Sequence, residues 1–294
     1  MIHSSQRRLR AFTLIELMAA TSVLVIIVLM ITQLISETSK VIKQDSNRMD
    51  SFSIARTLFD RMSIDWKSRV IGTEPGFFGI KELGDDTILM YSRGPAYSGT
   101  RSSATAVGYR ISDHIEGGRS LQRAALGYNW SETDPRPDDN PLVLDAGTMP
   151  VLDNADYQDV GLGVLRFEIA FLVYEPGATP PGTSTVSWKS VQPSAEELKP
   201  DKETGKVAKV LRGIGLYFVT MDKDSVKLLQ GNLAPVRNVD QVFLDAADGI
   251  DTAQIWRNIL NDSGKLAQDL GVPVLFTQGL QVYQRYLPLE TKGL

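Results

Sequence analysis

The chain has 294 residues, enough for a membrane segment and one folded domain of about 200 residues with a sizeable core. Its hydrophobic content of 43% and charged content of 22% are ordinary for a folded protein, and its formal net charge is −4. Cysteine is absent, which excludes disulfides, thiol nucleophiles and cysteine-based zinc sites.

Residues 1–11 are basic and free of acidic side chains, and a long apolar stretch follows them. From Phe12 to Ile35, 18 of 24 residues are apolar and only one is charged. A helix needs about 20 such residues to cross a bilayer core, whereas the apolar region of a secretory signal has about 7–15. We therefore expect residues 12–35 to span the membrane. Arg7, Arg8 and Arg10 should hold the N-terminus in the cytoplasm and leave the rest outside the inner membrane.

The one charge in this stretch is Glu16, near the start of the expected membrane helix. An acid at this depth is costly, so it indicates a function and needs a partner. A cut between Ala11 and Phe12 would create an amine on Phe12, four residues before Glu16, where the two groups can pair on one helix face. The amine of a neighbouring subunit is the other candidate.

Residues 7–35 contain a basic leader, a small residue, the sequence Phe-Thr-Leu-Ile-Glu-Leu and a long apolar helix, in that order. This order of features resembles the type IV pilin and type II secretion pseudopilin family. The resemblance implies that a prepilin peptidase removes residues 1–11 and methylates Phe12, and that Glu16 is the family's acid at the fifth mature position. One departure is Ala11, where the family usually has glycine. Cleavage would leave 28 basic against 35 acidic residues, and this net charge of −7 is a poor balance for binding nucleic acid. The alternative is an uncleaved signal anchor with Glu16 near the head groups.

The helix is predicted to continue beyond the membrane through residues 36–71, because the first glycine is Gly72 and the first proline Pro75. The apolar residues of this part recur at helical spacing: Phe52, Ala55, Phe59, Met62 and Trp66. One helix from about Phe12 to about Arg69 would be roughly 85 Å long. We expect its apolar stripe to bury against the chain's own domain; a coiled coil with a partner is the alternative.

Residues 72–294 are predicted to form a mostly β periplasmic domain. Short β-type runs separated by Gly, Pro and Asp indicate strands at Thr87–Ser92, Ala106–Ser112, Ser120–Leu126, Gly163–Tyr174, Ser184–Val191 and Lys209–Met221. Asn129–Asn140 and Pro193–Val207 have the composition of loops. The predicted fold class is α+β, with the long N-terminal helix packed on antiparallel β-sheet.

The C-terminal seventy residues mix the two periodicities. Val239–Ala247 and Asp251–Leu270 have helical spacing, and Gly271 and Pro273 should stop the second helix. Val274–Leu287 is expected to be a closing strand pair or one strand bent at Gly279.

The order of the strand motifs extends the resemblance. Three strand motifs follow one another: AVGYRIS with RSLQRA, then GVLRFEIAFLVY with VSWKSV, then LRGIGLYFVTMDKD. In this order, over residues 50–225, they are similar to the motifs of J-type minor pseudopilins. This implies a structural subunit of a type II secretion pseudopilus, in its tip complex. The implied partners are the prepilin peptidase, other minor and major pseudopilins, the inner-membrane assembly platform and membrane lipid. The alternatives are a type IV pilus minor pilin and a membrane-anchored periplasmic binding or enzymatic domain. Residues 228–294 are not explained by the resemblance.

Catalysis and cofactors are not expected. The two histidines, His3 and His114, are isolated, and no glycine-rich phosphate loop occurs. Two acidic groups could offer oxygen ligands to calcium, but neither has EF-hand spacing and both are more typical of solvated turns; they are Asp134, Asp138 and Asp139, and Asp153, Asp156 and Asp159. Trp130 and Trp188 are expected in the core, with exposed contact residues as the alternative.

Overall fold

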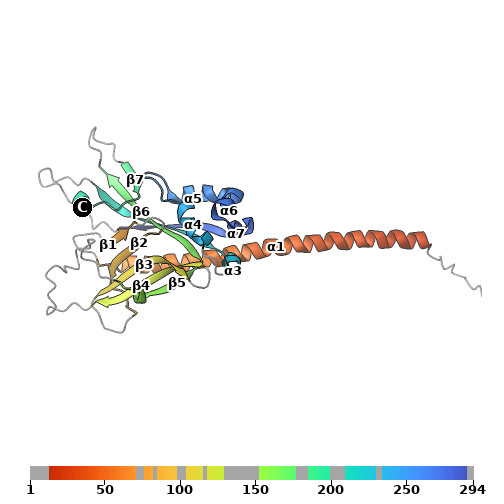
Figure 1. The fold of residues 1–294 in the computed structure, drawn as a ribbon, viewed down its shortest axis with the longest axis horizontal. Helices are drawn as coiled ribbons and strands as arrows, with labels where there is room; N and C mark the ends of the chain where they lie inside the picture. Colours follow the sequence, from red (N-terminus) through yellow and green to blue (C-terminus); the bar gives the residue numbers. More distant parts are fainter. Residues whose placement is uncertain are drawn as a thin grey trace, which may run out of the picture. The chain divides into compact units, whose positions relative to one another are not determined.

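The computed structural model describes residues 13–70, 76–81, 85–97, 104–114, 118–128, 152–176, 185–198, 209–229 and 234–289. It is an α+β structure, as predicted: a long N-terminal helix is followed by two antiparallel sheets and a group of C-terminal helices (Figure 1). The chain divides into two compact units, Met1–Ser46 and Asn47–Leu294, and each is described by itself.

Helix α1 (Leu14–Lys67) is 54 residues long and is unbroken because its sequence contains no glycine or proline. Its end lies close to the predicted Arg69. There the Ser68 hydroxyl donates to the carbonyl oxygen of Ile64, and Arg69 already forms an antiparallel bridge with Ser92. The helix therefore stops where its backbone joins a sheet.

The first sheet has the strand order β1–β2–β3–β4–β5, and all its neighbouring strands are antiparallel. The strands are β1 (Phe77–Ile80), β2 (Thr87–Ser92), β3 (Ala104–His114), β4 (Gly118–Tyr128) and β5 (Tyr157–Leu162). The three central strands match predicted runs, with longer bounds for β3 and β4. The sequence did not indicate β1, which has only four residues, or β5, whose acidic residues resemble a loop.

The second sheet has the order β7–β6–β8–β9, also antiparallel. Its strands are β6 (Val164–Glu175), β7 (Thr185–Lys189), β8 (Val210–Met221) and β9 (Leu280–Pro288). Strands β6 and β8 are buried on both faces, which explains why their sequences are nearly continuous apolar runs. Gly163, between β5 and β6, has φ of 82°, a left-handed conformation that glycine adopts without strain.

The helical elements after α1 are short: η1 (Asn154–Asp156), α2 (Ala195–Leu198), α3 (Lys223–Leu229), α4 (Ala234–Val242), α5 (Thr252–Asn261), α6 (Ser263–Leu270) and α7 (Val274–Gln278). The helical spacing over Val239–Ala247 corresponds only to the end of α4, and α2 lies within the predicted loop Pro193–Val207. The predicted loop Asn129–Asn140 lies outside the described residues.

Two predictions for the C-terminal region were wrong in detail. The single helix predicted over Asp251–Leu270 is divided at Asp262, which ends α5 and whose side chain accepts the Lys265 N–H to cap α6. Val274–Leu287 is not all strand, because its first five residues form α7. In that helix Phe276 and Thr277 are buried, so tertiary packing overrides the β-type composition.

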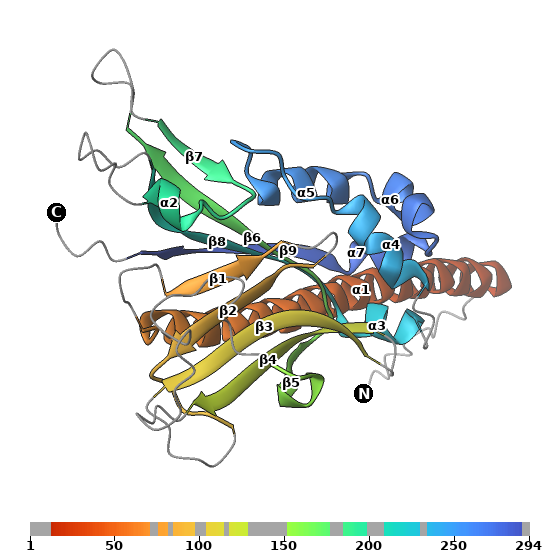
Figure 2. The same cartoon turned by 60° about the vertical axis from the view of Figure 1, so that its left-hand side comes forward.

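Two apolar clusters hold the folded unit together. The first joins the Ala55–Trp66 part of α1 to both sheets, and Figure 2 shows the helix running between them. The second fills the space between the other face of the second sheet and helices α3–α7. The predicted burial of the aromatic stripe is confirmed for Ala55, Phe59, Met62 and Trp66, which are at most 6% exposed, whereas Phe52 is 54% exposed.

Candidate functional site

Glu16 forms a reciprocal cap at the start of α1. The backbone N–H and the hydroxyl of Thr13 both donate to Glu16 Oε2 at 3.0 Å, and the Glu16 N–H donates to Thr13 Oγ1 at 3.3 Å. Because the first N–H groups of a helix have no intrahelical acceptor, this carboxylate satisfies its own helix end. The partner in the structure is thus Thr13.

The predicted cleavage site lies outside the described residues, since these begin at residue 13. This applies to Ala11, Phe12, Arg7, Arg8 and Arg10. The pairing of Glu16 with an amine on Phe12 therefore stays a prediction.

The apolar half of α1 exposes its side chains on all sides, from 47% at Ile27 to 77% at Leu14. In the part of the chain that the structure describes, this is the one helix long and apolar enough to cross a membrane. Its hydroxyl groups are satisfied within the helix: Ser22 donates to the Met18 carbonyl at 2.8 Å, and Thr32 to the Val28 carbonyl at 2.8 Å. Such internal bonding is what a hydrocarbon environment requires.

The second half of α1 is fixed to the first sheet by a buried ionic contact. Arg123 of β4 donates to both Asp65 carboxylate oxygens, at 2.8 and 3.0 Å, and the Tyr109 hydroxyl also donates to Asp65. All three side chains are at most 1% exposed. Burial, followed by the Asp65 charge, raises the pKa of Tyr109, which therefore stays a neutral donor.

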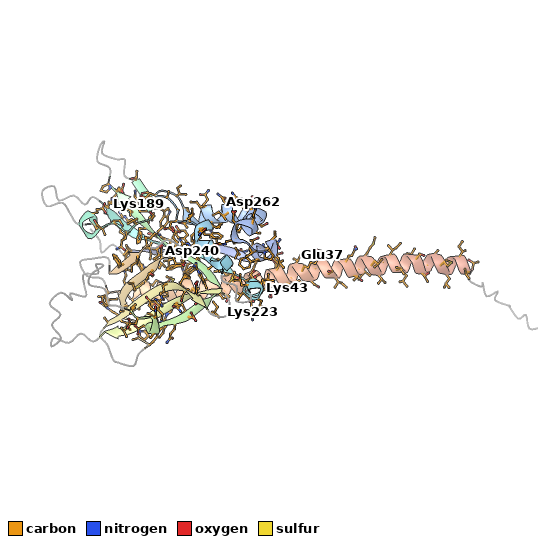
Figure 3. The ribbon with its side chains drawn as sticks, viewed as in Figure 1. Glu37, Lys43, Lys189, Lys223, Asp240 and Asp262 are labelled. Carbon is orange, nitrogen blue, oxygen red and sulfur yellow. The ribbon has the colours of Figure 1, made fainter. Side chains whose placement is uncertain are left out.

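A larger group of charges connects the two sheets to the C-terminal helices. We call it the charge cluster; it comprises Lys81, Asp85, Asp86, Arg119, Arg166, Glu168, Asp240 and Asp245. Arg119 Nη2 of β4 donates to Asp240 of α4 at 2.6 Å, and Arg166 of β6 pairs with Asp245 (Figure 3 labels Asp240). The cluster thereby links residues 234–245 to strands of both sheets.

Two carboxyl groups of the charge cluster are strongly perturbed. Burial raises the pKa of Asp85 to about 7, although the Arg119 guanidinium lies 3.0 Å away, and burial likewise raises the pKa of Glu168 to about 7. Perturbed carboxyl groups mark catalytic sites in some proteins and ion-pair networks in others. Here their partners are arginine and lysine side chains of the protein itself, which supports the structural role.

An open pocket of about 510 Å³ lies beside Asp85 and Arg119. It is lined by polar and charged side chains with one apolar residue: Asp85, Thr87, Arg110, Ile111, Ser112, Asp113, Arg119 and Asn154. Among the described residues no group of three or more His, Cys, Asp or Glu side chains is placed to hold a metal ion. The described lining of the pocket therefore offers charged and polar side chains to a polar ligand.

The other residues that the sequence singled out have structural surroundings where they are described. Asp156 accepts the Asp153 N–H at 2.8 Å, and Asp159 accepts from Gln122 at 3.1 Å and from Ser120. Trp188 is half-buried against the second cluster, with its ring edge-on to Tyr217 at 6.3 Å. Trp130, Asp134, Asp138, Asp139 and the side chain of His114 lie outside what the structure describes.

The sequence prediction missed both buried ionic groups, although their signals were present. Arg166 and Glu168 are charges at alternate positions of an otherwise apolar strand, and Asp65 falls between Met62 and Trp66 on the buried side of α1. Charged residues at core positions indicate paired burial.

Comparison with known proteins gives no relative: no protein-family model, no curated protein and no solved structure matches this chain.

Proposed function

We propose that the chain is a minor pseudopilin-like structural subunit of a type II secretion pseudopilus, processed by a prepilin peptidase and incorporated near the filament tip. The observation that carries the proposal is the form of α1. A 54-residue helix starts at an acid-capped terminus, exposes an apolar first half and fixes its second half inside a β-rich unit. This form provides a helix that can leave the membrane and pack in a filament while its other end carries a folded domain.

In this proposal the subunit enters the inner membrane once, with its N-terminus in the cytoplasm and the unit from Asn47 onward in the periplasm. Residues 1–11 are removed and Phe12 is methylated. Glu16 then selects the amine of its own Phe12 or that of a neighbouring subunit during assembly. The work of the protein is assembly with other minor and major pseudopilins, without catalysis and without a cofactor.

The test of the Glu16 role uses Glu16→Ala and Glu16→Val in a host with the complete assembly system. Membrane insertion and the unfolding midpoint of the folded unit should be unchanged, whereas the amount of subunit in sheared filament fractions should fall to background. Glu37→Ala is the matched control, because Glu37 lies on the same helix, is 71% exposed and pairs only with Lys40 among the described residues at 3.0 Å. Normal incorporation of both Glu16 variants would contradict the proposal.

Two alternatives remain as proposals. A type IV pilus minor pilin would have the same N-terminal helix, so partner capture distinguishes it: pilus rather than secretion-system subunits should co-purify. A membrane-anchored binding domain would use the pocket beside Asp85, whose charged lining is the observation in its favour. In that case Arg110→Ala should abolish a ligand-dependent thermal shift, and the wild-type chain should be absent from sheared filament fractions.

A further inference from the structure

Exposed apolar side chains gather on helices α3 and α7. Leu228 is 47% exposed, Val274 45% and Leu275 65%. Their chain neighbours Leu229 and Phe276 are fully inside the second core. Because each helix already commits its neighbouring residue to the core, the three exposed side chains are held outward and cannot turn inward.

The two helices form one surface, which we call the α3–α7 face. The Ser225 hydroxyl donates to the Phe276 carbonyl at 3.3 Å, and the Asp222 N–H donates to the Gly279 carbonyl at 3.0 Å. A Cβ atom at Gly279 would lie 2.2 Å from Ser225 Oγ, so glycine is needed for this close approach. The face is therefore rigidly attached to the folded unit.

The chain enters the folded unit at this face. The Asn47 side-chain amide donates to Asp222 at 3.2 Å and to Asp224 at 3.0 Å, directly before and within the first turn of α3. Asn47 is twelve residues after Ile35, the end of the apolar stretch. That segment belongs to the unbroken helix α1 and spans about 18 Å. A membrane that holds the apolar stretch therefore lies within this distance of the α3–α7 face.

The charges of the face are balanced. Lys223 and Lys227 are exposed (Figure 3 labels Lys223), and Lys227 Nζ lies 3.6 Å from Asp224. Asp222 accepts the Ser225 N–H at 2.7 Å. Lysine stems can extend toward phosphate groups while neighbouring leucines enter the boundary between head groups and acyl chains. Since acids and bases cancel, apolar insertion rather than attraction to anionic lipid is the driving force.

We propose that the α3–α7 face rests on the membrane surface, with Leu228, Val274 and Leu275 inserted among phospholipid head groups. This inference rests on the membrane anchoring in the proposed function. The contact orients the folded unit before assembly: β7 lies at the opposite end from α3 and α7 in both views and so points away from the bilayer (Figures 1 and 2). It also assigns a role to residues 228–294, which supply α7 and the helices behind it.

The absence of cysteine makes the test clean, since every introduced thiol is unique. The full chain, as Leu275→Cys or Leu228→Cys, is labelled with an environment-sensitive fluorophore and placed in phosphatidylcholine nanodiscs with doxyl-labelled lipid as quencher. Val186→Cys is the matched control, because Val186 is 59% exposed on β7. Leu24→Cys reports insertion of the apolar helix.

The labels at positions 275 and 228 should be quenched by doxyl lipid at least about threefold more than the label at 186, and should be protected from iodide. Adding phosphatidylglycerol to the nanodiscs should change the doxyl quenching at positions 275 and 228 little. In a second variant, Leu275→Glu should reduce quenching of the label at 228.

Quenching at 24 together with equal, weak quenching at 275, 228 and 186 would overturn the surface contact and leave membrane anchoring intact. If the labels at 275 and 228 were protected from iodide but not quenched by doxyl lipid, protein would cover the α3–α7 face. That result would also overturn the proposed membrane contact. A requirement for anionic lipid would contradict the apolar mechanism. Absence of quenching at 24 would overturn the anchoring and this inference together.

Discussion

The two halves of helix α1 have the same backbone and opposite surroundings. Up to Ser46 the apolar side chains are exposed, as at Val28 (52%) and Leu34 (70%), whereas Leu58 and Trp66 beyond it are each 2% exposed. Both halves lack glycine and proline, so helix propensity does not distinguish them. The difference is in the pattern: apolar residues occur on all sides of the membrane stretch, whereas in the second half the buried apolar residues form one stripe. The first half needs an apolar environment from outside, and the second finds one in its own sheets.

Breaking the ionic contact of the second half should have the largest effect on stability. Asp65→Ala leaves Arg123 buried without its bidentate partner, and should lower the free energy of unfolding by about 3–5 kcal/mol. Urea denaturation of the full chain in detergent measures this. The double variant Asp65→Leu/Arg123→Met should recover most of the loss, because it removes both charges. Asp60→Asn, which affects an exposed pair with Arg285, should leave the midpoint nearly unchanged.

A pair of phenylalanines on α1 tests the stripe itself. Phe59 is 6% exposed and stacks on Phe218 with 4.6 Å between ring centroids, so Phe59→Ala should cost about 3 kcal/mol through lost burial and a cavity. Phe52 is 54% exposed, and Phe52→Ala should cost less than about 1 kcal/mol. Equal losses in urea denaturation would contradict the difference in burial between the two positions, which lie two turns apart on the same stripe.

The charge cluster should make the stability of the folded unit fall as pH rises. Because the pKa values of Asp85 and Glu168 are raised to about 7, the folded protein keeps protons that the unfolded chain loses above about pH 4. Stability should therefore decrease between about pH 4 and 7 and level off above that range. Asp85→Asn should reduce the difference in the free energy of unfolding between pH 5 and pH 8 by on the order of 1–3 kcal/mol. Urea denaturation at the two pH values measures this difference.

Asp248→Asn is the control for that experiment. The Ser190 N–H donates to Asp248 and lowers the pKa of this exposed carboxyl, which is ionised throughout the tested range. The slope of stability against pH should not change in this variant. A wild-type protein whose stability rises between pH 5 and pH 7 would contradict the assignment of the cluster.

Much of the fold followed from local sequence. The unbroken helix came from the absence of glycine and proline, and strands β6 and β8 from their apolar runs. What the sequence did not indicate depends on distant partners. The sequence of strand β5 is acidic and resembles a loop. Its Asp159 is held by Ser120 and Gln122, which lie on β4 and are distant in the sequence. Helix α7 has a β-type composition, and the burial of Phe276 among the C-terminal helices decides its form.

The candidate site was predictable at Glu16, because a single acid in an apolar stretch is visible without any structure. Its contact with Thr13 could also have been predicted, since Thr13 and Glu16 have the spacing of a capping box. The α3–α7 face could not, because Leu228 and Leu275 are 47 residues apart and only the fold brings their helices together.

The most direct test of the account is the intact mass and N-terminal sequence of the chain extracted from membranes, with and without an active prepilin peptidase. The account predicts that the peptidase removes residues 1–11 despite Ala11 and leaves one added methyl group on Phe12. An unchanged Met1 terminus in the presence of active peptidase would contradict it, and would favour an anchored domain in which Glu16 only caps its own helix.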